Sequence, residues 1–583
     1  MLVGMQTLTS LVDSIVDKNG GTGTLTLLGA DGVATDRIPW RDLHDRARRM
    51  ATVLRRYGLG AGCRVGLVGE TSANLVAALQ AVWLTGGAFT VLPPAGPTGR
   101  RNHDDHVRAV AEDARLDLVV DDDAGGRAAA ELAPVLSLTE LASAAGTAPP
   151  AVPHRPDPGD LALLQYTSGS TRSPRGVPVT HGHLAANVGA MKVALGHDAS
   201  HPSRMLSWLP LYHDMGLIGF LFIPLSCGCD LLLQSPSAFV RNPASWLVAM
   251  SRYRVTMSGA PNFAYALMAR LLAAGGPDLD LGSVRCLISG GEPIDEAVMA
   301  KLASAGRAVG LDPAAVVPAY GLAEATLAAT MAPVGRGVSV DRVDQQTLET
   351  EGRAVAAVAG RPERRLVRVG GPVRDVTVRI VDRGTGEPVG DRVVGHIELR
   401  GPSIVGHYWP DPPPPPDSWL RTGDLGYLAG GELVVCGREK DVLFAAGRNV
   451  FPQDVEAVAV EVSGVRSGGA VAFGVPRAGG DGLVVVVESR GADPAIVRHA
   501  VASAVVAEVG LAPADVLTVS YGRLPKTSSG KLRRAEARRR YLAGGFESRS
   551  ERTDQWPPSR QLTHAGTGTA GNLPSSSTST SRH

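Results

Sequence analysis

The segment LLQYTSGSTRSPRGVPVTH, from Leu163 to His181, runs an apolar strand directly into a loop of small hydroxyl residues, glycines and arginines. Backbone amides of glycine-rich turns, hydroxyl donors and a guanidinium together form a cradle for phosphate oxygens. The loop residues with this chemistry are Thr167, Ser168, Gly169, Ser170, Thr171, Arg172, Arg175 and Gly176. The chain has no P-loop pattern here, and near Gly530-Lys531 the first glycine of that pattern is Pro525. A Ser/Thr/Gly loop alone is more often a plain turn, so a phosphate site needs support from other segments.

Upstream of this loop, helix and strand patterns alternate. RVGLVGE (Arg64 to Glu70) and AFTVL (Ala88 to Leu92) are apolar runs typical of buried strands, and between them Ser72 can cap a helix. The alternation continues through MLSWLP, RCLISGG and VVPAYG, which end in Gly or Pro where ligand loops are expected. This order predicts an α/β fold, with a large N-terminal domain of mixed, largely parallel sheets and flanking helices.

The length of 583 residues predicts at least two domains. From about Gly437 onward the chain has the pattern of a smaller α/β unit, with a strand in LVVVVES (Leu483 to Ser489) and a helix beginning at Asp493-Pro494. After about Gly545 it turns to Ser, Thr, Gly and Pro. We therefore expect an N-terminal domain over 1–437, a small mobile C-terminal domain over 438–545 and a disordered tail over 546–583.

Composition excludes several classes of protein. Hydrophobic residues at 44% and charged residues at 20% are typical of a soluble globular protein, and a net charge of +1 attracts neither nucleic acid nor an anionic membrane. The longest apolar run, Met215 to Cys229, is too short to span a bilayer. No signal peptide is recognisable, so a cytoplasmic enzyme or binding protein is expected. Cys227-x-Cys229 lacks zinc spacing, and we expect buried, reduced thiols at Cys63, Cys227, Cys229, Cys286 and Cys436.

Four further segments carry charged groups in a fixed order. They are AYGLAEATL with Tyr320 and Glu324, RTGDLG with Asp424, GREKD with Arg438 and Lys440, and LPKTSSGKLRR with Lys531. Together with the loop, this set resembles the adenylate-forming superfamily: acyl- and aryl-CoA ligases, adenylation domains of peptide synthetases, and luciferases. The resemblance covers about residues 30 to 543 and implies an enzyme that uses ATP to activate a carboxylic acid.

The resemblance implies a role for each charged group. The Thr167–Gly176 loop would hold the β- and γ-phosphates of ATP, and Glu324 would bind Mg²⁺ directly or through water. Asp424 would accept both ribose hydroxyls, with Arg438 on the same sugar. Lys531 would bridge the substrate carboxylate and the α-phosphate, which cancels the repulsion between two anions. The simpler alternatives are a surface glutamate and an ordinary turn aspartate.

Adenine would lie between the turn Ser289-Gly290-Gly291-Glu292-Pro293 and the pair Tyr320-Gly321, because glycines let backbone lie flat against a base. Two departures from the family pattern leave the required groups in place: Ala323 replaces the threonine of Y-G-x-T-E, and Arg175 replaces the usual loop lysine but keeps its charge.

A moving small domain follows from the same resemblance. Lys531 belongs to the predicted small domain, whereas the phosphate loop and Asp424 belong to the large one. Catalysis would then require closure and product transfer would require reopening. Lys440 matches the hinge position of the family, although a plain surface lysine would look the same.

The acid is predicted to be fatty. The segments Leu209 to Cys229 and Ser258 to Leu271 are strongly apolar, and an apolar tunnel stabilises an alkyl chain by about 0.8 kcal/mol per buried CH₂. YHDMG, APNFAY and YGLAEATL resemble the fatty acyl-AMP ligase branch, in which His213 would gate the acyl pocket. A core histidine and ordinary core segments are the alternatives.

The acceptor is predicted to be a carrier protein. The segment Gly337 to Gly360 resembles the insertion that, in fatty acyl-AMP ligases, disfavours the rearrangement that admits CoA. The acyl group would then pass to the phosphopantetheine thiol of an acyl carrier protein. Between Arg523 and Arg540, eight basic residues and one acidic residue give a local charge of +7 that could steer an acidic carrier. The insertion could instead be an inert surface loop and the charges a solvated face.

Three rival functions remain open at this point. A CoA ligase of the same fold would release acyl-CoA, and a ligase for an aryl or branched acid would have the same motifs. A non-catalytic nucleotide-binding scaffold is the alternative of another class, but intact Glu324, Asp424, Arg438 and Lys531 count against it.

Overall fold

The computed structural model describes residues 7, 9–10, 12, 23–94, 100–122, 126–167, 174–197, 203–275, 278–445, 448–477, 480–526 and 531–546. The predicted tail over 546–583 lies outside these residues, apart from Phe546. Two compact units are recognised, Met1–Arg539 and Arg540–His583. The predicted boundary between 437 and 438 falls within the first unit and stays a prediction.

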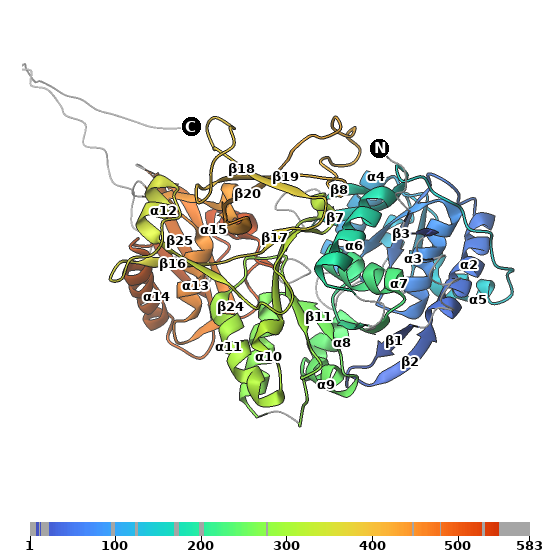
Figure 1. The fold of residues 1–583 in the computed structure, drawn as a ribbon, viewed down its shortest axis with the longest axis horizontal. Coiled ribbons are helices and arrows are strands. Elements are labelled where there is room, and N and C mark those ends of the chain that lie inside the picture. The colour runs from blue at the N-terminus through green and yellow to red at the C-terminus, as the bar shows by residue number, and fades with distance from the viewer. Residues whose placement is uncertain are drawn as a thin grey trace, which may run out of the picture. The chain divides into compact units, whose positions relative to one another are not determined.

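A nine-stranded mixed sheet forms the centre of the first unit (Figure 1). Its order is β17 (Gly371–Pro372), β14 (Ala328–Met331), β13 (Val316–Gly321), β12 (Cys286–Ser289), β11 (Met257–Ala260), β9 (Arg204–Ser207), β10 (Asp230–Gln234), β1 (Thr24–Leu28) and β2 (Ala34–Pro39). The run from β13 to β1 is parallel, and the antiparallel strands lie at the two edges. The helices that accompany it are α8 (Pro236–Arg241), α9 (Ala244–Arg252), α10 (Asn262–Ala273) and α11 (Glu296–Gly306).

A six-stranded sheet carries the opening segment of the phosphate loop. Its order is β6 (Val135–Ser137), β5 (Leu118–Asp121), β3 (Arg64–Val68), β4 (Ala88–Leu92), β7 (Leu161–Thr167) and β8 (Arg175–Thr180). All neighbours are parallel except β7 and β8, which form a hairpin. The helices near it are α2 (Trp40–Arg56), α3 (Ala73–Thr85), α4 (Arg100–Ala114), α5 (Leu138–Ala145) and α6 (His181–Ala194). The Ser72 hydroxyl accepts from the Leu75 amide, so the predicted cap of α3 is confirmed.

The predicted largely parallel α/β architecture is therefore confirmed, and its core is apolar. Leu43, Ala47, Met50 and Leu54 line the inner face of α2 and are all fully buried. They pack in one cluster with α3, which contacts both β3 and β4 (Figure 1). No helix among the residues that the structure describes has the length and apolarity needed to cross a membrane.

A four-stranded antiparallel sheet follows, with the order β18 (Thr377–Val381), β19 (Gly395–Arg400), β20 (Leu420–Ala429) and β21 (Glu432–Arg438). Beside it the predicted insertion is ordered. Residues 337–360 supply β15 (Val340–Asp344) and α12 (Gln345–Glu351), and β15 pairs with β16 (Glu363–Val367). Val343 and Leu348 of the insertion pack in one cluster with Leu425 and Tyr427 of β20, so this segment is part of a core.

The chain after β21 builds its own small core. The elements are β22 (Leu443–Ala445), β23 (Arg448–Val450), α13 (Pro452–Val460), β24 (Val465–Arg477), β25 (Gly480–Ser489), α14 (Pro494–Val509), β26 (Asp515–Val519) and α15 (Arg534–Leu542). Asp493 caps α14 through the Ala495 amide, as predicted, and the LVVVVES segment is part of β25. Val485, Val501 and Val505 are fully buried in the cluster that joins β25 to α14.

Candidate active site

The loop predicted to bind phosphate is the connection of the β7–β8 hairpin. Thr167 ends β7 and faces Arg175 at the start of β8 in antiparallel register. Ser168, Gly169, Ser170, Thr171 and Arg172 lie outside the described residues, as does the side chain of Thr167. Gly176 follows Arg175, and a Cβ at this position would lie 3.0 Å from Cζ of the Tyr166 ring. The base of the loop therefore has no room for a side chain at 176.

Glu324 and the phosphate loop are joined by a tyrosine. The hydroxyl of Tyr408 donates to Oε1 of Glu324. The guanidinium carbon of Arg175 lies 3.6 Å from the centroid of the same ring. Burial and the bond to Glu324 raise the pKa of Tyr408, which stays a neutral donor at physiological pH. The structure thus brings together Glu324 and Arg175, and the residue between them was missed because GHYWP resembles none of the motifs.

Asp424 lies opposite Arg438 in the register of β20 and β21, with 3.3 Å between Arg438 Nε and Asp424 Oδ1. The Tyr320 hydroxyl donates to Oδ2 at 2.7 Å. Burial raises the pKa of Asp424 above its ordinary value, and Arg438 and Tyr320 oppose the rise. Glu324 is near enough to raise this pKa further. Tyr320, Asp424, Arg438 and Glu324 therefore belong to one electrostatic site.

The predicted adenine turn is built from a close strand approach. A Cβ at Gly290 would lie 2.9 Å from the Ala319 carbonyl oxygen in β13, and Gly291 has a φ of +80°. Gly321, at the end of β13, is equally restricted, since a Cβ there would lie 1.8 Å from the Leu327 carbonyl oxygen. Glycine is thus required by the backbone at these positions, whether or not a base binds.

The next two residues of the turn anchor it to a helix. Oε1 of Glu292 accepts from the Asn262 amide at the start of α10, at 2.7 Å. The carbonyl of Pro293 accepts from the side chain of the same asparagine. Burial raises the pKa of Glu292, while the Asn262 amide and Lys531 lower it. The side chain of Glu292 holds the turn in place.

Lys531 lies at the same turn. Its Nζ is 3.6 Å from the position that a Cβ would take at Gly291. The predicted catalytic lysine therefore lies beside the predicted adenine turn. Its charge also acts on Asp214, the neighbour of His213.

His213 is paired with Asp214, the next residue of the YHDMG motif, for which the resemblance implied no role. Its Nδ1 lies 2.6 Å from Oδ1 of Asp214, and the same carboxylate accepts from the Met215 amide. Burial favours a higher pKa for Asp214, but His213, Lys531 and the Met215 amide together hold the pKa below its ordinary value. A π-helix, Met215–Phe222, begins here, and all its residues are buried. Such helices are rare and are frequently found at functional sites.

Lys440 occupies a short turn, Glu439–Asp441, directly after β21. Burial of its ammonium group and the neighbouring Arg438 lower its pKa. The hinge role remains a prediction.

The basic segment is less available to a partner than its charge indicated. Arg534 lies 2.6 Å from Glu456 and 3.2 Å from Asp441, both in the first unit. Lys526 donates to the Gly468 carbonyl and Arg538 to the Gly474 carbonyl. Much of the +7 charge is thus used in internal contacts.

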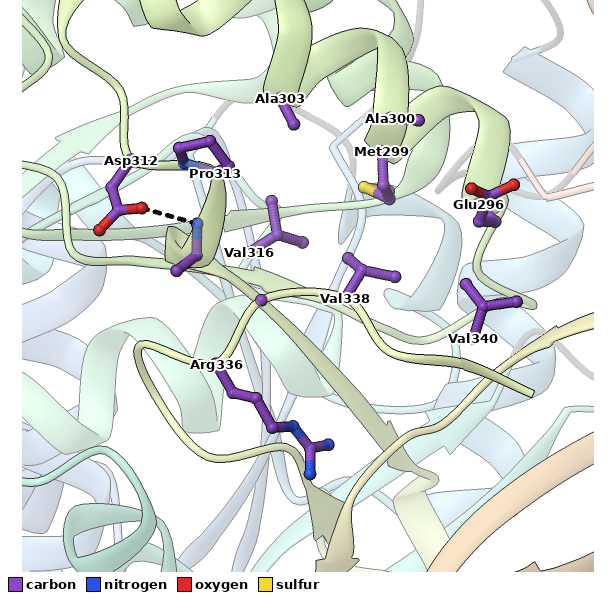
Figure 2. Close-up of a pocket in the computed structure, with 12 residues that line it drawn as sticks. Glu296, Met299, Ala300, Ala303, Asp312, Pro313, Val316, Arg336, Val338 and Val340 are labelled. Carbon is purple, nitrogen blue, oxygen red and sulfur yellow. Dashed lines mark hydrogen bonds between the residues drawn. The ribbon is translucent and has the colours of Figure 1, made fainter.

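A shallow pocket of about 400 Å³ lies elsewhere (Figure 2). Met299, Val316 and Val338 form its apolar part, between α11, β13 and the start of the insertion. Its polar groups are already engaged, because Asp312 accepts from the Ala314 amide and Arg336 pairs with Glu432. No predicted site residue lines it, so the chemistry is not assigned to this pocket.

Comparison with known proteins places these features in a family. The sequence profile of the AMP-binding enzymes matches residues 29–409. A Mycobacterium tuberculosis protein described only as a ligase is 38% identical over 541 residues, which are 89% of this chain and 97% of that protein.

Two relatives with named substrates are equally similar to this chain. The 4-hydroxyphenylalkanoate adenylyltransferase of M. tuberculosis is 33% identical over 557 residues, covering 88% of this chain and 87% of that protein. The long-chain-fatty-acid–AMP ligase FadD26 of Mycobacterium marinum is 33% identical over 580 residues, covering 93% and 95%.

A solved structure from work on fatty acyl-adenylate ligases of E. coli and L. pneumophila superposes with a TM-score of 0.83. It is 32% identical and covers 92% of this chain and 98% of that one.

Proposed function

The chain belongs to the AMP-binding enzyme family and is an adenylate-forming ligase, and from this premise we propose that it activates a fatty acid with ATP and passes the acyl group to a carrier protein. The first half-reaction joins the acid to the α-phosphate and releases pyrophosphate. In the second, the phosphopantetheine thiol of an acyl carrier protein displaces AMP.

One observation supports the proposal most directly. Tyr320, Asp424 and Arg438 contact one another, and Glu324 is close enough for its charge to act on Asp424 and Arg438. Asp424 has carboxylate oxygens suited to two ribose hydroxyls, and the Tyr320 ring beside it suits a base attached to that sugar. Lys531, next to Gly291, supplies a positive charge where the carboxylate and the α-phosphate would meet.

Glu324 fits the Mg²⁺ that such a reaction uses. Hard oxygen ligands suit this ion, and the Tyr408 hydroxyl engages Oε1, which leaves Oε2 for a cation or its bound water. The ion, when bound, neutralises phosphate charge. Tyr408 orients the carboxylate, and Arg175 stacked on its ring presents a second positive charge toward the loop.

The fatty character of the acid rests on the His213 segment and the FadD26 relative. The π-helix that follows Asp214 contributes buried apolar residues such as Leu217, Ile218 and Phe220. The His213–Asp214 pair directly precedes this helix, and the charge of Lys531 acts on Asp214. An aryl alkanoate is the second candidate, because the adenylyltransferase relative is equally similar.

The choice of a carrier thiol over CoA rests on contacts of the insertion with the chain beyond the predicted hinge. Glu349 of α12 lies 3.2 Å from Arg448 of β23, and its backbone carbonyl accepts from Asn449. Nearby, Arg364 of β16 lies 2.9 Å from Asp454 of α13. We call the two ion pairs, Glu349–Arg448 and Arg364–Asp454, the latch. A latched small domain resists the rotation that would admit CoA.

The test is mass spectrometry of products from a panel of alkyl and aryl acids with ATP, with CoA, and with a phosphopantetheinylated carrier protein. The proposal expects alkyl-AMP from ATP alone and alkyl-carrier thioester in preference to alkyl-CoA. If only aryl-AMP forms, the substrate is an aryl acid and not a fatty acid. If alkyl-CoA forms rapidly, the acceptor is CoA and not a carrier protein. Absence of any acyl-AMP would favour the scaffold alternative and defeat the proposal.

A further inference from the structure

Three metal-ligating side chains meet away from the residues assigned to nucleotide binding. His197 follows α6, Cys227 ends α7 (Ile223–Cys227), and Cys229 precedes β10. One nitrogen of the imidazole and the two sulfur atoms all lie within 4.8 Å of one another, and His197 Nδ1 is 3.9 Å from Cys229 Sγ. Within the described part of the chain, no other group of three His, Cys, Asp or Glu donors is this compact.

The distances suit a tetrahedral thiolate site. Zinc binds sulfur at about 2.3 Å and imidazole nitrogen at about 2.0–2.1 Å, so tetrahedral ligands lie about 3.6–3.8 Å apart. The 3.9 Å between His197 and Cys229 is already close to that value. Small side-chain rotations would bring all three donors to a common ion.

The backbone around the cysteines is firmly held. Gly228 adopts a left-handed conformation with φ of 64°, which turns the chain between the two thiols. The Cys229 carbonyl accepts from Trp40 Nε1 at 2.7 Å, and Cys229 itself is only 3% exposed. A site whose supporting backbone is fixed loses little entropy when an ion binds.

The donor set selects the class of ion. Two sulfur ligands and an imidazole favour thiophilic ions over magnesium or calcium, which prefer oxygen. His197 comes from 30 residues upstream of Cys227, which explains why the cysteine spacing alone gave no zinc pattern.

We propose that His197, Cys227 and Cys229 form a binding site for a thiophilic divalent cation of the zinc class, with water in the fourth position. The ion would join the end of α6 to the turn between α7 and β10. None of the three residues is among those assigned to the nucleotide or to catalysis, although Cys227 and Cys229 end the apolar segment predicted to line the acyl tunnel. Metal binding by the chain without substrates is therefore measured separately from the proposed function.

The test uses the full chain, reduced and freed of metal with a chelator. Titration with Co²⁺ is expected to produce a thiolate charge-transfer absorption that saturates at one ion per chain and is displaced by Zn²⁺. Cys227→Ser and His197→Ala should each weaken binding more than about tenfold. Cys63→Ser is the matched control, since Cys63 is a partly exposed free cysteine outside the cluster. Binding that is unchanged in the cluster variants, or no charge-transfer band, overturns the proposal.

A second measurement needs no variant. Alkylation of the native protein, mapped by mass spectrometry, should be slowed by Zn²⁺ at Cys227 and Cys229 but not at Cys63. Equal protection of all three thiols would indicate non-specific binding and would reject the site. A Cys227–Cys229 disulfide that forms readily in air and is not prevented by Zn²⁺ would reject it as well.

Discussion

The nucleotide site and the latch both pair carboxylates with cations, but they use the charges differently. In the nucleotide site, Asp424 receives a directed hydrogen bond from Tyr320, while the side chain of Arg438 is 57% exposed. In the latch, Glu349 is 1% exposed and Arg364 is 5% exposed. The first pair therefore joins a buried carboxylate to an exposed arginine, whereas neither partner of a latch pair is more than 25% exposed.

The latch pairs also differ in geometry. Glu349 Oε2 and Asp454 Oδ2 lie within ion-pair distance of their arginines but without hydrogen-bond alignment. Charge, more than a directed bond, therefore holds these segments together. Such pairs depend on the distance between the two charges more than on a fixed bond angle. Directed contacts suit a site that must present fixed oxygens to a sugar.

The largest effect is expected from Lys531→Ala. Removing the charge beside Gly291 should slow acid-dependent pyrophosphate exchange by about 10²–10³-fold, because it leaves two anions unscreened in the transition state. Lys526→Ala is the matched control from the same segment, where Lys526 donates to the Gly468 carbonyl. Full exchange activity in Lys531→Ala would contradict the assigned mechanism.

Arg448→Met tests the latch. Breaking a buried ion pair typically costs about 3 kcal/mol, and this arginine also donates to the Val509 and Gly510 carbonyls. Urea unfolding should show the loss, and the share of product recovered as acyl-CoA should rise. The exposed Arg307→Met serves as the control. A destabilised variant that still excludes CoA would separate the latch from acceptor choice.

Lys531 could be predicted from the sequence, whereas the Glu349–Arg448 pair could not. Lys531, Asp424 and Glu324 each stand in a short motif that can be recognised in the sequence by itself. Arg448 and Glu349 lie 99 positions apart, and no local pattern marks them. The parallel sheets followed from periodicity and the helix starts at Ser72 and Asp493 from residue type, whereas Tyr408 needed the fold to bring it to Glu324, 84 positions away.

Asp424→Asn should raise KM for ATP by about tenfold to a hundredfold, since it replaces a charged acceptor by a neutral amide. The raised pKa of Asp424 gives this a pH signature. In the wild type, KM should fall as pH rises through that pKa and the carboxylate forms. The variant should lose this dependence, and Asp382→Asn, at a partly exposed turn, should keep it. If KM for ATP in the wild type does not fall as pH rises, Asp424 does not bind the ribose as a carboxylate.

The smallest effect is expected from Tyr408→Phe, which keeps the ring under Arg175 but removes the donor to Glu324. Loss of one hydrogen bond to a carboxylate costs about 1–2 kcal/mol, so activity at low Mg²⁺ should fall about five- to tenfold and recover as Mg²⁺ is raised. Tyr427→Phe is a matched control, because Tyr427 donates to Asp341 at 2.7 Å in a separate buried pair. It should lower stability without changing the Mg²⁺ dependence. If Tyr408→Phe lowers stability without changing the Mg²⁺ dependence, the Tyr408 hydroxyl has only a structural role. The contact between Tyr408 and Glu324 would then stabilise the protein, as the latch pairs do, and would not prepare Glu324 for a cation.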